Sequence, residues 1–76
     1  MQTLTRHTAP DYWIAQIFGR KSARRGAVIR RSMAWVAREI GDQRFRAEVR
    51  DRGFHLLQTA DQYIVVCHPG PVHILF

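Results

Sequence analysis

The spacing of apolar residues is helical up to Arg52 and strand-like after Gly53. Thr8 is typical of a helix N-cap and Gly19 of a C-cap, so we expect a first short helix between them. Four residues at helical spacing form its apolar face: Trp13, Ile14, Ile17 and Phe18.

A second helix is predicted over residues 27–40, where the helical period is clearest. Its apolar positions fall at i, i+4, i+7, i+8 and i+11: Ile29, Met33, Val36, Ala37 and Ile40. Gly41 is expected to end this helix, and Asp42 to cap a third one. Phe45 and Val49, at i and i+4, mark the inner face of that third helix.

Strand-like runs occupy residues 54–59, 63–67 and 72–76, with turns at 60–62 and 69–71 between them. The pattern therefore predicts an α+β fold in which three N-terminal helices precede a three-stranded antiparallel β-meander, in two layers. We expect one domain over residues 1–76. Its parts would be a loose N-terminus (1–7), a basic helical part (8–52) and the meander (53–76).

Length and composition restrict the class of protein. A chain of 76 residues with 46% hydrophobic residues is large enough for one small core and too apolar for an obligately disordered tail. The single cysteine, Cys67, excludes an intramolecular disulfide framework, and no apolar run approaches the length of a membrane span. We therefore expect a cytoplasmic protein without a transmembrane segment.

The charge is concentrated in the middle of the chain. The formal net charge is +6, and residues 20–52 hold eleven of the twelve basic residues, ten of them Arg. Arg suits contact with phosphate or carboxylate, although a basic face can also serve solubility alone. Arg24, Arg31 and Arg38 lie seven apart and would share one flank of a long second helix. The candidate phosphate-contacting residues are Arg20, Lys21, Arg24, Arg25, Arg31 and Arg38.

The residues around Gly41 partly match a helix-turn-helix motif. Ala37 and Gly41 have the spacing of the motif's turn, but its later inner positions would fall on Asp42, Ala47 and Arg50. Only one of these three is apolar. The hairpin further along the chain would suit the wing of a winged helix, whereas an ordinary helix pair joined by glycine is the simpler interpretation.

The sequence offers little for catalysis or for cofactors. His55, Cys67, His68 and His73 fall in the predicted sheet, but none has the spacing typical of metal ligands, and Cys67 is interpreted as a small buried hydrophobe. Phosphate-binding loops, nucleophile elbows and acid–base pairs of carboxylates are absent from the sequence. We therefore predict no enzymatic activity, no catalytic residue, no metal and no cofactor.

Part of the chain resembles a known family. The helix ending in Gly53-Phe54, the following hairpin, Cys67-His68-Pro69-Gly70 and a last apolar run make residues 44–76 similar to HicA-type toxins. The resemblance implies an RNA-cleaving protein with a double-stranded-RNA-binding-like fold. That family carries its catalytic His after a Gly-Ser pair on the second strand, where this chain has Asp61-Gln62-Tyr63. The resemblance therefore implies a fold without cleavage.

A second resemblance extends over the whole chain. The Arg-rich helical half, followed by Arg-Gly-Phe-His and a Gln-Tyr strand, resembles small uncharacterised bacterial proteins. It implies no activity.

The final run, residues 72–76, is apolar and carries no acid or lysine. As an edge strand it would invite pairing with another strand, so a homodimer through this edge is a further hypothesis.

Two functions of different classes follow from these patterns. The first is a small basic, regulatory protein that binds DNA or RNA by phosphate contacts from the Arg-rich segment. The alternative is a non-enzymatic interaction module or accessory subunit that meets an acidic protein through its arginines and its apolar final strand. Binding to anionic lipid ranks third.

Overall fold

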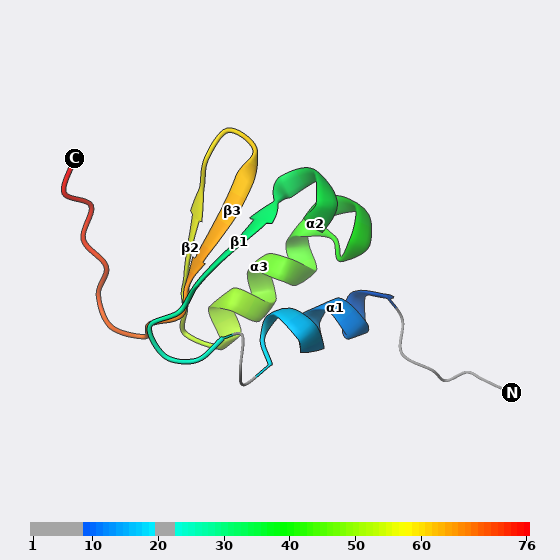
Figure 1. Ribbon diagram of the computed structural model, residues 1–76, viewed down its shortest axis with the longest axis horizontal. Helices are drawn as coiled ribbons and strands as arrows, with labels where there is room; N and C mark the ends of the chain where they lie inside the picture. The colour runs from blue at the N-terminus through cyan, green and yellow to red at the C-terminus, as the bar shows by residue number, and fades with distance from the viewer. Residues whose placement is uncertain (1–8, 20–22) are drawn as a thin grey trace, which may run out of the picture.

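Six elements follow one another as helix, strand, helix, helix, strand and strand in the computed structural model, which describes residues 9–19 and 23–76 (Figure 1). They are α1 (Ala9–Ile17), β1 (Val28–Ser32), α2 (Met33–Glu39), α3 (Asp42–Asp51), β2 (His55–Gln58) and β3 (Gln62–Val66). The α+β class is confirmed, but β1 precedes α2 and α3, so the helices do not all precede the sheet. The predicted cap Thr8 and the segment 1–7 lie outside the described residues.

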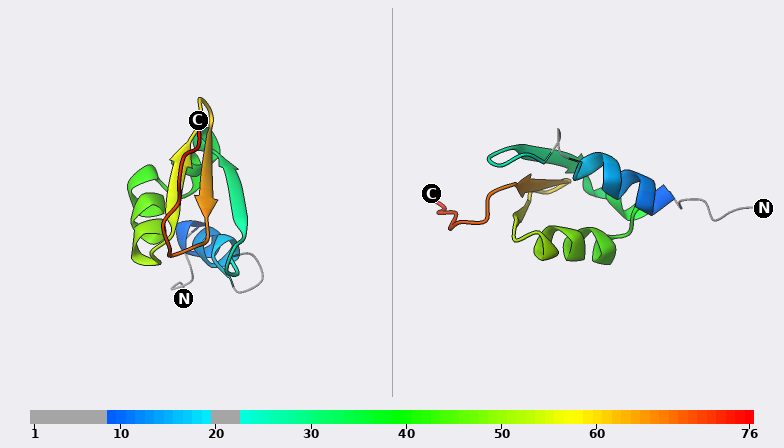
Figure 2. Two further views of the ribbon diagram at one scale, coloured as in Figure 1. Left: turned by 90° about the vertical axis from the view of Figure 1, so that its left-hand side faces the viewer. Right: turned by 90° about the horizontal axis from the view of Figure 1, so that it is seen from below.

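The sheet is antiparallel and has the strand order β1-β3-β2. β3 is therefore the central strand, and Val65 has Ile29 of β1 on one side and Leu56 of β2 on the other. Figure 2 shows the helices gathered on one face of the sheet, while the opposite face carries no helix among the described elements.

The predicted second helix is wrong over its first part, because residues 28–32 form the strand β1 and only residues 33–39 are helical. Gly26, with φ of 86°, turns the chain before β1, and the β-branched pair Val28-Ile29 favours a strand. The apolar stripe nevertheless continues across the boundary, because Ile29 on the sheet and Val36 on α2 face the same core.

The predicted third strand of the meander is also wrong. Residues 72–76 form no strand and are exposed throughout. β3 already has a partner along both of its edges, so the place that the meander assigned to residues 72–76 is taken by β1. After β3 the chain runs away from the helices, on the helix-free side of the sheet (Figure 1).

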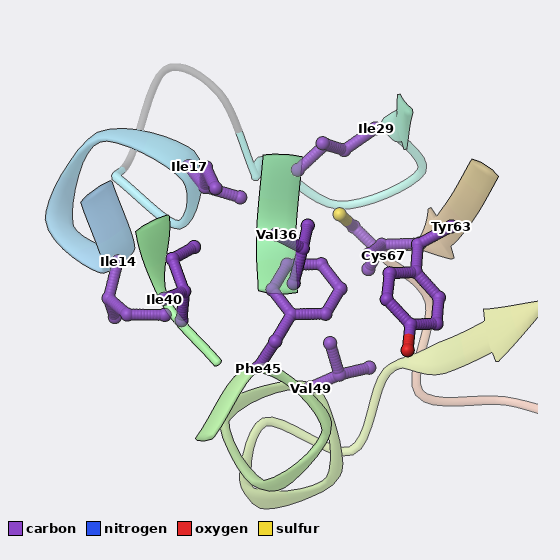
Figure 3. Close-up of a cluster of buried hydrophobic side chains, with 10 residues drawn as sticks. Ile14, Ile17, Ile29, Val36, Ile40, Phe45, Val49, Tyr63 and Cys67 are labelled. Carbon is purple, nitrogen blue, oxygen red and sulfur yellow. The ribbon is translucent and has the colours of Figure 1, made fainter. Parts of the chain in front are cut away.

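One core unites the three helices and the sheet. Figure 3 shows Phe45 of α3 among Val36 of α2, Val49 of its own helix and Tyr63 of β3. The rings of Phe45 and Tyr63 stack with centroids 5.3 Å apart, and α1 adds Ile14 and Ile17 to the same cluster. The predicted inner face of the third helix and the burial of Cys67 are both confirmed.

The junctions on either side of α2 are short. Ser32 ends β1 and caps α2, its hydroxyl accepting a hydrogen bond of 3.1 Å from the backbone N–H of Trp35. α3 begins directly after Gly41, whose φ of 96° and ψ of 135° are conformations that residues with a side chain rarely adopt. A single glycine thus sets the angle between α2 and α3.

Candidate nucleic-acid interface

The predicted basic residues do not form one row. Arg24 and Arg25 lie in the turn before β1, Arg31 lies on β1, and Arg38 lies near the end of α2. Because residues 28–32 are a strand, Arg24, Arg31 and Arg38 belong to three different elements, and the predicted shared helix flank is wrong. Arg20 and Lys21 lie outside the described residues.

Carboxylates pair with some of the arginines. Arg38 Nε lies 3.0 Å from Glu39, and Arg44 contacts both Glu48 at 2.8 Å and Asp11 at 2.9 Å. Arg52 lies 2.6 Å from Glu48, and its guanidinium also covers the ring of Phe18. The salt bridges of Arg44 and Arg52 therefore occupy the side of α3 that faces α1.

These pairs also shift the pKa values of their members. Hydrogen bonds from Arg52 and then Arg44 hold the pKa of Glu48 below its ordinary value. The pKa of Arg44 is raised in turn, first by Glu48 and then by Asp11. The guanidiniums of Arg44 and Arg52 thus balance the carboxylates of Glu48 and Asp11, which makes these groups poor candidates for ligand contact.

The other side of α3 presents a different set of side chains. Gln43, Arg46 and Arg50 are exposed and lie at i, i+3 and i+7, and Arg46 and Arg50 lie along the flank of the helix next to Val49 and β2. Neither of these two arginines has a carboxylate within salt-bridge distance among the described residues. We call Gln43, Arg46 and Arg50 the α3 face.

Tyr63 holds Arg46 in place. Arg46 Nη2 donates to the Tyr63 hydroxyl at 3.3 Å, and its guanidinium lies 5.7 Å from the centroid of that ring. The hydrogen bond to Tyr63 raises the pKa of Arg46, so this side chain stays positively charged. The Tyr63 hydroxyl in turn donates to Asp42 Oδ1 at 3.0 Å, which ties the start of α3 to the central strand.

A hollow of about 350 Å³ lies between the α3 face and β2. Arg46 and Arg50 contribute to its lining together with apolar groups from Val49, Phe54 and Leu56. It is thus an open hollow of mixed polar and apolar lining with two positive charges at its side, suited to a group that has an apolar part and a negative charge.

The open edge of β2 borders this hollow. Thr59 N–H donates to Gln62 O at 2.9 Å, so by antiparallel alternation the N–H groups of Leu56 and Gln58 point away from β3. No charged residue or proline lies within β2 to block pairing at this edge. On the other edge strand, Arg31 donates to Arg30 O at 2.7 Å and occupies a backbone acceptor.

The histidines and Cys67 form no comparable site. Cys67 is fully buried, and burial raises the pKa of its thiol, which disfavours the reactive thiolate. His55 Nε2 lies 2.6 Å from Gly70 O, a contact that anchors the chain after β3. Within residues 9–19 and 23–76, no three His, Cys, Asp or Glu side chains gather as metal ligands would. None of the described helices has the length and apolar character of a membrane span.

Comparison of the chain with models of protein families, with curated proteins and with solved structures finds no match.

The sequence analysis missed the α3 face, although a signal for it was present. Gln43, Arg46 and Arg50 lie at i, i+3 and i+7, on a flank beside Phe45 and Val49, the two positions that marked the inner side of this helix. The seven-residue spacing of Arg24, Arg31 and Arg38 indicates a shared flank only in a continuous helix, whereas here Arg24 lies in a turn and Arg31 on a strand.

Proposed function

We propose that the protein binds double-stranded DNA, with α3 as the helix that enters the major groove. The observation that carries the proposal is the α3 face: Gln43, Arg46 and Arg50 on one exposed side of the second helix of a pair, with no carboxylate partner among the described residues. Arg and Gln are the side chains best suited to the edges of guanine and adenine.

The arrangement of the elements supports the same proposal. A helix pair joined at Gly41 and followed by the hairpin β2–β3 has the layout of a winged helix, with α3 in the place of the recognition helix. The inner positions of α3 differ from those that the helix-turn-helix match in the sequence would require. Because α3 begins at Asp42, its inner positions are Phe45 and Val49, whereas Ala47 and Arg50 belong to its outer side.

DNA is favoured over double-stranded RNA because of the width of the major groove that a helix has to enter. The major groove of B-DNA admits an α-helix, whereas that of A-form RNA is too narrow for side chains to read. Arg24 and Arg25 are further exposed cations that can add phosphate contacts.

The test is a titration of labelled duplexes with the whole chain, monitored by fluorescence anisotropy at 50 mM and 200 mM salt. The wild type should bind the DNA duplex more tightly than an RNA duplex of the same sequence, and affinity should fall steeply with salt. Arg50→Ala should weaken DNA binding roughly tenfold, the effect expected for one Arg contact to a base edge.

The matched control is Arg44→Ala, which removes the same charge from the same helix on the side that faces α1. It should change the affinity less than twofold. An absence of DNA binding at 50 mM salt contradicts the proposal. Equal losses from the two variants contradict the assignment of the α3 face, because they indicate a response to net charge alone.

A second candidate is supported by the hollow beside β2. An extended acidic peptide could add a strand at the open β2 edge, place an apolar side chain in the hollow and pair its carboxylates with Arg46 and Arg50. Gln58→Pro removes a backbone donor at this edge without touching α3. A protein partner that is retained after nuclease treatment and lost with Gln58→Pro favours this candidate, whereas DNA binding should tolerate the change.

A further inference from the structure

The helix-free face of the sheet is largely apolar. Residues paired across strands share a face, so Val28 and Val66 lie on this side with His55, and Ile64 lies between Arg30 and Leu57 in the next row. Arg30 is the one charged residue that the three strands place there, and Val28 is 58% exposed.

The sequence of β3 indicates that something covers this face. An antiparallel strand with one face in water alternates apolar and polar residues, whereas residues 63–67 are apolar at five consecutive positions. Three of the five positions, Tyr63, Val65 and Cys67, are apolar because they are buried under the helices. Ile64 and Val66 point to the other side, where the described residues supply no second layer.

Apolar residues of the last segment are exposed on the same side of the molecule. Four large apolar side chains of this segment are exposed, Ile74 at 79% and Leu75 at 83%, together with Val72 and Phe76. In Figure 2 (left) the sheet is seen from its helix-free side, and residues 72–76 run in front of it. We call this segment the tail. The sheet face, where Val28 is exposed and Ile64 and Val66 are half-buried, and the tail are thus two apolar surfaces on one side of the molecule.

The base of the tail directs it away from its own sheet. His55 Nε2 lies 2.6 Å from Gly70 O, which fixes the chain beside the start of β2. Pro69 and Pro71 flank Gly70 and restrict the backbone there. An apolar segment held away from its own sheet is available for exchange with a second copy, which is a low-cost route to a dimer.

Charge indicates which partner covers the two surfaces. The chain carries +6 overall, yet residues 53–76 contain a single charged residue, Asp61, if the histidines are neutral, and Arg30 is the one charge that the strands add to the sheet face. An acidic partner would gain little at such a surface. A second copy, repelled by the arginines elsewhere, meets the least repulsion there.

We propose that two copies pair through their helix-free sheet faces, each laying its tail across the sheet face of the other. The exchange is symmetric and closes on itself, so it produces a dimer and not a filament. It leaves the α3 face uncovered, because α3 lies on the opposite side of the sheet (Figure 2, right). This inference does not rest on DNA binding.

Sedimentation equilibrium at high micromolar concentration tests the oligomeric state. The whole chain should show twice its mass of 8.9 kDa, and Ile74→Asp should show the single mass. The tail makes no contact with the core cluster, so this variant should keep the circular dichroism and melting of the fold. Tyr12→Asp is the matched control, because it places the same charge at an exposed apolar position on α1, away from the sheet face, and should remain dimeric.

Cross-linking tests the exchange itself. Val28→Cys and Ile74→Cys variants are mixed and oxidised with diamide, and the buried native Cys67 should not react. A disulfide-linked product with one copy of each variant is expected. A wild type of single mass at high micromolar concentration overturns the proposal. The exchange is also contradicted if a Val28→Cys/Ile74→Cys double variant forms its disulfide within one chain and the mixture of single variants gives no linked product.

Discussion

The hydroxyl of Tyr63, in the centre of the sheet, donates a hydrogen bond to Asp42 Oδ1, at the first residue of α3, over 3.0 Å. The same hydroxyl accepts from Arg46 one turn further along, and the ring stacks on Phe45 between them. One side chain therefore sets the height and the rotation of α3 on the sheet. The orientation of the α3 face depends on a residue that lies outside that helix.

Tyr63→Phe should lower the free energy of unfolding by about 1 kcal/mol, because it removes the hydrogen bond to Asp42 and keeps the ring in the core. Denaturant unfolding monitored by circular dichroism measures the change. Tyr12→Phe, at a half-exposed position on α1, is the control and should have no measurable effect. Equal stability of wild type and Tyr63→Phe would show that the hydroxyl does not hold α3.

Gly41→Ala should lower the free energy of unfolding by about 1–3 kcal/mol, the cost of forcing a residue with a Cβ into this backbone region. No atom lies within 4 Å of the added Cβ, so the cost is one of backbone conformation alone.

Gly26→Ala is the matched control, since Gly26 also has a positive φ and open space around it but lies before β1. Thermal unfolding should show similar losses for the two variants. Only Gly41→Ala should also weaken DNA binding, because Gly41 sets the angle of α3. A parallel loss of DNA binding in both variants argues against that role.

The stability of the fold should depend on the protonation of Glu48. Arg52 and Arg44 hold its pKa in the folded state below its ordinary value of 4.5, so Glu48 stabilises the fold above that pH. The contribution is lost as the pH falls through the lowered pKa.

Glu48→Gln should therefore destabilise the protein at neutral pH, by about 0.3–1 kcal/mol for two solvent-accessible pairs, and the difference from wild type should shrink in acid. Unfolding curves recorded across this pH range at low and high salt measure the effect. High salt should reduce it as well. A difference that grows on acidification contradicts the assignment.

The thiol of Cys67 should be inert in the folded protein. It is fully buried, and its pKa is raised by desolvation, so both access and thiolate formation are suppressed. A chromogenic disulfide reagent should label one thiol per chain rapidly in guanidinium chloride and only slowly, at the rate of unfolding, in buffer. Rapid labelling of the native protein contradicts this expectation.

The sequence was sufficient to predict elements whose signals are local. Gly41 and Gly53 correctly bracket the third helix, the turn near Asp61 correctly separates two strands, and Phe45 and Val49 correctly mark a buried helix face. In each case a helix stop, a turn or a period acts within a few residues, so no knowledge of the rest of the fold is needed.

The sequence was insufficient where distant segments decide the structure. Val28 to Ser32 becomes a strand because β3 offers it an edge, and a helical period that continued by coincidence concealed this. Residues 72–76 have the composition of a strand, but β3 has no edge left for them. The candidate site therefore differs from the predicted one: the row of arginines required a helix over residues 27–40, whereas the structure offers the α3 face instead.

The direct junction between β1 and α2 has a mechanical consequence. Ser32 ends the strand and caps the helix, so no joint separates the sheet from the helix pair. The orientation of α2 relative to the sheet is therefore set at Ser32, and that of α3 relative to α2 at Gly41. In a pair of copies joined at their helix-free sheet faces, the two α3 helices would lie on opposite outer sides of the dimer, so each would be free to bind a duplex of its own.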